Sequence, residues 1–80
     1  MNASYNLHKA QYKKAKETLD LLLLHKAEID RKLESNFSSA TLHKDLRTVN
    51  MDIRITENEM EHAQFRILEY ESKYNSSEAT

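Results

Sequence analysis

Glycine and proline are both absent from the 80 residues of this chain. Proline interrupts helices and glycine supplies most tight hairpin turns, so their absence favours long helices over other structures. Cysteine is absent too, which excludes a disulfide scaffold and thiolate metal sites. A chain of this length forms at most one small domain, and it buries only about 60% of its unfolded surface, so we expect marginal stability without a partner.

Hydrophobic residues recur at alternating spacings of three and four in two stretches, which is the heptad pattern of a coiled coil. The first stretch contains Tyr12, Ala15, Leu19, Leu22, Ile29 and Leu33, with Lys26 in the remaining slot. The second contains Leu42, Leu46, Val49, Ile53, Met60, Ala63, Ile67, Tyr70 and Tyr74, with Thr56 in the remaining slot. We call these the seam positions, and they predict two long amphipathic helices.

The pattern stops once, at the segment ESNFSSAT, where Ser and Asn side chains compete with helical hydrogen bonds. Asn36 is expected to end the first helix in the left-handed conformation, and Ser38 or Ser39 to cap the second. With Ser38 as the cap, Phe37 and Leu42 would form a hydrophobic staple. The predicted organisation is one domain over residues 1–80, with a helix at about 5–34, a turn at 35–39, a helix at about 40–74 and a frayed tail at 75–80.

A link this short forces the two helices to lie antiparallel. If Leu33 packs against Leu42, the remaining layers are Ile29/Leu46, Lys26/Val49, Leu22/Ile53, Leu19/Thr56, Ala15/Met60, Tyr12/Ala63, His8/Ile67 and Tyr5/Tyr70. Six of these nine layers are apolar on both sides. The predicted fold is therefore all-α, an antiparallel two-helix hairpin of the coiled-coil type, and two such hairpins could pair into a four-helix bundle.

The same alignment sets charged residues opposite one another beside the seam. The facing pairs with opposite charge or with a histidine are Lys32/Asp45, Lys16/Glu57, His25/Asp52 and Asp30/His43. Each exposed pair contributes only about 0–1 kcal/mol, so we expect these pairs to fix the orientation of the helices more than to stabilise them. Three polar seam residues, Lys26, His8 and Thr56, are expected to leave their polar ends in water.

A set of large apolar side chains falls outside the seam positions. They are Leu21, Leu24, Met51, Ile55, Phe65 and Leu68. A two-layer hairpin is too thin to bury them. Met51 and Ile55 fall at the same height as Leu21 and Leu24, and apolar residues gathered at one height are typical of an interaction surface. We therefore interpret them as a surface that binds another helical protein chain or a second copy of this one. The alternative is a scatter of exposed apolar residues with no function.

Several kinds of partner are excluded by charge and hydropathy. The net charge of −1 argues against binding to nucleic acid, which requires clustered Lys and Arg. The longest apolar run, Leu21 to Leu24, is far shorter than the roughly 20 residues of a membrane span. The first residues lack the basic and then apolar order of a signal peptide, so we expect a cytoplasmic protein.

No catalytic or metal-binding set can be recognised. Glu59 and His62 have the Glu-x-x-His spacing of di-iron bundles, but that chemistry needs a second such motif and inward-facing Glu residues. There is no glycine-rich phosphate loop and no recognisable set of nucleophile, His and acid, and a thin hairpin lacks a concave pocket. We therefore expect no enzyme activity, no small-molecule substrate, no metal and no cofactor.

The layout from RKLESNFSS to FRILEYESKY resembles the small helical-hairpin co-chaperones of bacterial type III secretion systems. This chain differs in having no Gly in its turn and a longer lead-in at residues 1–11. The resemblance implies a non-enzymatic adaptor that pairs with a repeat-type helical chaperone and keeps a needle subunit soluble. The alternatives are a homodimeric four-helix bundle that acts as a regulator or immunity-type protein, and a structural coiled-coil spacer.

Overall fold

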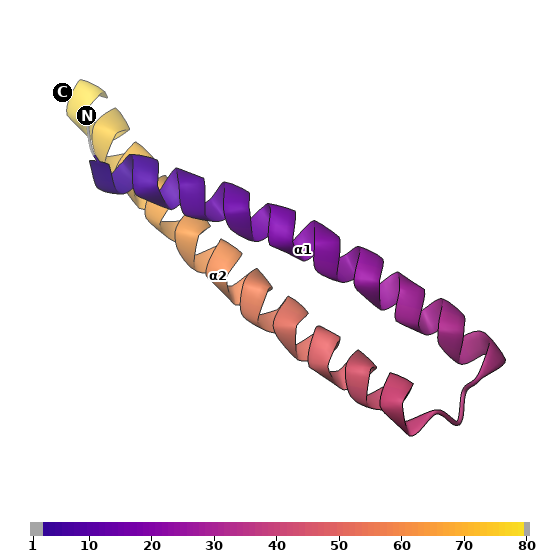
Figure 1. Cartoon of the computed structure of the whole chain (residues 1–80). Coiled ribbons are helices and arrows are strands. Elements are labelled where there is room, and N and C mark those ends of the chain that lie inside the picture. Colours follow the sequence, from indigo (N-terminus) through magenta and orange to yellow (C-terminus); the bar gives the residue numbers. More distant parts are fainter. Residues whose placement is uncertain (1–2, 80) are drawn as a thin grey trace.

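The fold is a hairpin of two long helices. The computed structural model describes the backbone of residues 3–79 and the side chains of residues 3–73. Helix α1 (Ala3–Ser35) and helix α2 (Ala40–Ala79) lie antiparallel, with both ends of the chain at one end of the rod and the turn at the other (Figure 1). Residues 3–79 contain no strand. The prediction of an all-α helical hairpin is confirmed.

The molecule is a rod rather than a globule. Its principal extents are 63 × 14 × 14 Å, and the radius of gyration of its Cα atoms is 18.2 Å. A compact domain of the same length would have a radius of gyration of about 12 Å. Two helices side by side leave most of each helix facing solvent, so the seam between them is the main place where side chains can be buried.

Burial along both helices follows the predicted seam positions. In α1, the side chains withdrawn from solvent are Tyr5, His8, Tyr12, Ala15, Leu19, Leu22, Lys26, Ile29 and Leu33, and no other side chain of residues 3–35 joins them. In α2, the seam positions from Leu42 to Tyr70 are all buried or half-buried. Tyr74 lies outside the described side chains. The heptad pattern arises because these positions face the other helix. Asp52 and Glu69 of α2, which are not seam positions, are half-buried as well.

The core is small and lies in the half of the rod nearer the turn. Ile29, Val49 and Ile53 form its buried centre. Half-buried leucines pack around this centre, namely Leu19, Leu22, Leu33 and Leu46. Nearer the chain ends the buried apolar side chains are the small ones of Ala15 and Ala63. The hydrophobic stabilisation is therefore concentrated near the turn.

Thr56 differs from the expectation that its polar end would reach water. Its side chain is buried, and its hydroxyl donates a hydrogen bond of 2.8 Å to the carbonyl oxygen of Asp52, one turn earlier in α2. This bond satisfies the hydroxyl inside the seam, because a threonine can share the carbonyl four residues before it. A threonine therefore occupies a core position without an unpaired polar group.

Ser39, and not Ser38, is the N-cap of α2. The Ser39 Oγ accepts a hydrogen bond of 3.2 Å from the Leu42 N–H, three residues into the helix. With the cap at this residue, the predicted staple between Phe37 and Leu42 has the wrong spacing. Phe37 is exposed, and its carbonyl oxygen instead contacts Nε2 of His43.

The end of α1 also differs from the prediction. No residue of the described chain has a positive φ angle, so Asn36 does not adopt the left-handed conformation. Instead the Asn36 N–H donates to the carbonyl oxygen of Leu33 at 3.2 Å, and the Ser35 hydroxyl donates to the carbonyl oxygen of Lys32 at 3.3 Å. A tightened last turn thus satisfies the carbonyl groups that a left-handed cap would have covered.

Both helices extend beyond their predicted ends. α1 begins at Ala3 instead of about residue 5, and α2 continues to Ala79 instead of about residue 74. The segment expected as a frayed tail is thus helical up to Ala79, and Thr80 lies outside the described residues. Ser, Asn and Thr lower helix propensity only modestly, and no Gly or Pro is present to stop the helix.

The predicted ion pairs between the helices are not formed. Both ion pairs between described side chains join residues of one helix, Lys32 with Glu28 at 3.4 Å and Arg66 with Glu69 at 3.1 Å. Lys32 therefore pairs with its own helix rather than with Asp45. Such exposed side chains gain little from either arrangement, and the partner one turn away requires less ordering.

Candidate functional site

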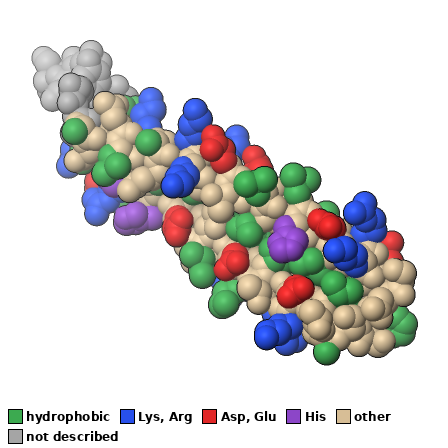
Figure 2. Space-filling view, viewed as in Figure 1, with side chains coloured by type: hydrophobic (Ala, Val, Ile, Leu, Met, Phe, Trp, Pro, Cys, Tyr) green, Lys and Arg blue, Asp and Glu red, His purple; other side chains and the backbone are tan. Residues whose placement is uncertain are grey.

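All six side chains interpreted as a binding surface are exposed. Their exposed fractions range from 49% for Ile55 to 69% for Leu24. Leu7, Leu23 and Phe37 are large, apolar and exposed as well, although the sequence interpretation did not include them in the surface. On the face seen in Figure 2, hydrophobic side chains appear at several heights along the rod, between charged ones. Apolar area is therefore available on the outside of both helices.

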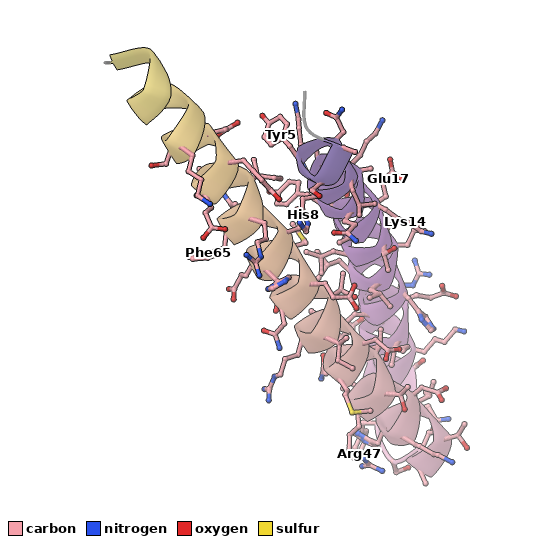
Figure 3. All side chains as sticks on the ribbon, turned by 90° about the vertical axis from the view of Figure 1, so that its left-hand side faces the viewer. Tyr5, His8, Lys14, Glu17, Arg47 and Phe65 are labelled. Carbon is pink, nitrogen blue, oxygen red and sulfur yellow. The ribbon has the colours of Figure 1, made fainter. Side chains whose placement is uncertain are left out.

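The six residues do not form one patch. Each residue turns an α-helix by about 100°, so the direction of each side chain follows from its distance to the seam positions. Leu24 lies on the back of α1, the side opposite the seam, whereas Met51 and Phe65 lie on the corresponding back of α2. The backs of the two helices face opposite directions. Phe65 points away from α1 in Figure 3. Only Leu21 and Ile55 lie along the same edge of the hairpin.

The more continuous surface is a second heptad stripe on α2. We call it the outer stripe; it consists of Thr48, Met51, Ile55, Asn58, His62 and Phe65. These residues repeat at spacings of three and four, and all six are exposed. With histidine neutral, none carries a formal charge. A helix of a soluble rod usually presents charge on this face, so an uncharged outer stripe of about five turns is a candidate interface.

The corresponding stripe of α1 is interrupted by charge. Lys14 and Glu17 lie between its apolar residues, and both project from α1 on the side away from α2 (Figure 3). Leu21 and Leu24 are therefore an isolated apolar pair. The candidate interface belongs to α2, with Leu21 close to its edge.

A groove runs beside the outer stripe. It has a volume of about 570 Å³ and lies over the place where Ala15 and Ala63 form the seam. Its lining residues are Gln11, Lys14, Ala15, Thr18, Ile55, Asn58, Glu59, His62 and Ala63. The groove exists because the two alanines lie in adjacent layers, where larger side chains would fill the space. Ile55, Asn58 and His62 belong both to the groove and to the outer stripe.

Glu59 and His62, the pair with the metal-ligand spacing, both line this groove. Among the side chains of residues 3–73, no three His, Asp or Glu residues lie close enough to hold a metal ion. The groove is lined mainly by neutral side chains, with Lys14 and Glu59 as the charged members. Its apolar lining comes from Ala15, Ile55 and Ala63.

No helix of the described chain is long and apolar enough to cross a membrane. Comparisons with protein-family models, with curated proteins and with solved structures gave no match.

Proposed function

We propose that this hairpin is a non-enzymatic protein-binding module whose outer apolar residues are covered by a helical partner. The observation that carries this proposal is the outer stripe of α2, an uncharged and exposed heptad pattern beside a groove. A heptad stripe is the pattern by which helices recognise other helices, and here no side chain of residues 3–73 covers it.

The surface area of the chain supports the same proposal. The accessible surface is 6331 Å², whereas a compact protein of 9.4 kDa exposes about 5,000 Å². The hairpin thus keeps a large excess of surface in contact with water. A partner that covers part of this excess would supply burial that the two helices cannot supply for each other.

The free energy gained when a partner buries the outer stripe is appreciable relative to the stability of a small domain. Complete burial of Met51, Ile55 or Phe65 is worth about 1.5–3 kcal/mol for each side chain, before the costs of association. The buried centre of the hairpin is small, with no large side chain fully buried among the described residues. Binding would therefore stabilise the hairpin as well as its partner.

The partner of this module is either a different helical protein or a second copy of the same chain. The resemblance to type III secretion co-chaperones favours a cytoplasmic adaptor that pairs with a repeat-type helical chaperone. The outer stripe favours a homodimer, because a stripe of this kind can pair with a copy of itself. In both versions the chain covers apolar surface and catalyses no reaction.

Substitutions on the two outer faces test the proposal. Ile55→Glu places a charge in the outer stripe, and Leu24→Glu places one on the back of α1. We expect Ile55→Glu to weaken association at least tenfold, with most of the helicity retained by circular dichroism. Leu24→Glu should have a smaller effect. Ala27→Glu adds the same charge at another exposed position and serves as the matched control.

Association can be measured by sedimentation of the purified chain and by its binding to a coexpressed helical partner. The proposal is supported if Ile55→Glu reduces either form of association while Ala27→Glu leaves it unchanged. If Ile55→Glu associates as strongly as the parent chain and Ala27→Glu do, the outer stripe is not an interface and the proposed function fails.

A further inference from the structure

The outer stripe of α2 is complementary to itself when two copies lie antiparallel. We propose that the partner covering this stripe is a second copy of this chain, bound α2 to α2 across a two-fold axis. This inference rests on the proposed function and names its partner. Three features of the chain support this pairing: the order of residues along the stripe, the charges at its ends and edges, and the groove beside it.

The layers of this pairing follow from one contact. If Ile55 of one copy packs against Asn58 of the second copy, the heptad spacing sets Met51 against His62 and Thr48 against Phe65. Because the axis is two-fold, each of these layers occurs twice. In all three, a large apolar side chain faces a smaller or polar one, so the large apolar residues do not collide.

The ends of the stripe carry opposite charges. Lys44 follows the stripe towards the turn, and Glu69 follows it towards the chain end. In the antiparallel pairing, Lys44 of one copy lies opposite Glu69 of the second copy, again twice. A parallel pairing in register would instead set Lys44 against Lys44, so the charges favour the antiparallel orientation.

The two edges of the stripe support the same register. On one edge, Arg54 of one copy lies opposite Glu61 of the second copy. On the other edge, Asp45 lies opposite Arg66, which within one chain pairs with Glu69, while Asp52 lies opposite Glu59 of the second copy. Counting both ends and both edges, three kinds of charge pair are attractive and one is repulsive. The charges around the outer stripe of a second copy therefore complement those of the first.

The groove receives a side chain in this arrangement. The residue of the second copy that faces His62 is Met51, which is exposed and flexible. The groove of about 570 Å³ over Ala15 and Ala63 lies beside His62 and is open to it. Met51 of each copy would thus reach the groove of the other, so that both grooves receive the same residue.

The available area matches what a dimer requires. A specific interface buries about 800 Å² on each partner. The hairpin exposes 6331 Å², roughly 1,300 Å² more than a compact protein of its mass would expose. The excess surface of the whole rod is therefore larger than the area that one such interface buries on each copy.

A charge exchange between Arg54 and Glu61 tests the pairing and its register together. The two residues are seven positions apart on α2, about 10 Å, so they do not pair within one chain. Arg54→Glu alone sets Glu against Glu61 of the second copy twice, and Glu61→Arg alone sets Arg against Arg54 twice. Mixing the two variants restores both attractive pairs in the heterodimer. Arg31→Glu on α1 is the matched control.

Sedimentation equilibrium over a range of concentrations gives the dissociation constant of each sample. We expect the parent chain and Arg31→Glu to form dimers of about twice 9.4 kDa. Each single variant should dimerise about ten to a hundred times more weakly, and the equimolar mixture should recover parental affinity. Circular dichroism of each variant shows whether the hairpin itself remains helical.

Each result decides a separate question. A parent chain that stays monomeric overturns the second copy as the partner. The proposed function is then tested with a different helical chain, whose binding should be lost in Ile55→Glu and kept in Ala27→Glu. A dimer that ignores both single variants, or a mixture that recovers nothing, overturns this pairing. A dimer that also survives Ile55→Glu overturns the outer stripe and the proposed function together.

Discussion

The hydroxyl of Tyr5 in α1 donates a hydrogen bond of 2.8 Å to Oε2 of Glu71 in α2. The two residues are separated by nearly the whole chain. Tyr5 lies at the end of the rod opposite the turn (Figure 3), so this hydrogen bond joins the helices there. The Tyr5 ring also lies edge-on to the ring of Tyr70, at 6.1 Å between centroids, and His8 stacks on Tyr70 at the same distance. This cluster confirms the predicted Tyr5/Tyr70 layer and holds the open end of the hairpin together.

Stability should fall at alkaline pH because of this contact. The hydrogen bond to Glu71 raises the pKa of the Tyr5 hydroxyl above its ordinary value of 10.0, with smaller contributions from desolvation and from the charge of Glu71. Since the pKa is higher in the folded state, the contribution to stability is complete below pH 10 and is lost as the pH rises through the folded pKa. Tyr5→Phe removes this dependence.

Thermal unfolding from pH 8 to pH 12 measures the effect. The parent chain should be more stable than Tyr5→Phe at pH 8, and the difference should disappear at the alkaline end. Tyr12→Phe serves as a control, because it also removes one tyrosine hydroxyl. A difference that stays constant over this range would show that the hydrogen bond to Glu71 does not contribute to stability.

Truncation in the small core should be costly, whereas truncation on the outer surface should not. Ile29→Ala removes a side chain that is 3% exposed at the centre of the core, and we expect a loss of about 2–4 kcal/mol. Leu24→Ala removes an apolar side chain that is 69% exposed on the back of α1, and we expect a change within about 0.5 kcal/mol. Urea unfolding monitored by circular dichroism measures both. Equal losses would mean that the seam is not the main source of stability.

Replacement of Thr56 by valine should stabilise the hairpin by about 0.5–1 kcal/mol. The Thr56 hydroxyl bonds only to the Asp52 carbonyl oxygen, a group that the helix ladder already satisfies. Valine keeps the shape of the side chain and removes a polar group from a position that is 6% exposed. Thr56→Ser keeps the hydroxyl, loses a methyl group and should destabilise. If valine destabilises, the hydroxyl has a partner beyond its own helix.

The seam could be predicted from the sequence because burial in a two-helix rod depends on angular position alone. Each position that faces the other helix recurs with the heptad, so the pattern of Leu, Ile and Val identifies it directly. Lys26 and Thr56 break the apolar pattern without breaking the seam, because one has a long aliphatic stem and the other bonds within its helix. Helix ends were less predictable, since Ser38 and Ser39 are equally able caps.

The candidate surface was only partly predictable. The exposed apolar residues could be identified as those left over from the seam, but grouping them by height placed Leu24 with Met51. These two residues lie on the backs of different helices. The groove between Ala15 and Ala63 was missed as well, although the signal for it was present as two adjacent layers that each contain an alanine. Pairs between charged surface residues were least predictable, because local partners such as Glu28 and Lys32 compete.

Glycine at position 36 should not stabilise the turn. Asn36 has a negative φ angle, so a glycine there gains nothing from its access to positive φ and only increases the freedom of the unfolded chain. We expect Asn36→Gly to lower the free energy of unfolding by about 0.5–1 kcal/mol. Asn36→Ala, which keeps the ordinary backbone preference, is the comparison. A more stable glycine variant would indicate that α1 ends in a left-handed conformation after all.

Loss of the Ser39 cap should destabilise the hairpin, whereas loss of the neighbouring hydroxyl should not. Ser39→Ala removes the acceptor for the Leu42 N–H and should lower the free energy of unfolding by about 1 kcal/mol. Ser38→Ala removes an exposed hydroxyl at the adjacent position, and we expect a change within about 0.3 kcal/mol. Ser39→Asp should retain most of the stability, since aspartate is an equally good cap and its charge is favourable at a helix N-terminus. Urea unfolding of the three variants measures these differences, and a larger effect for Ser38→Ala than for Ser39→Ala would mean that α2 begins one residue earlier.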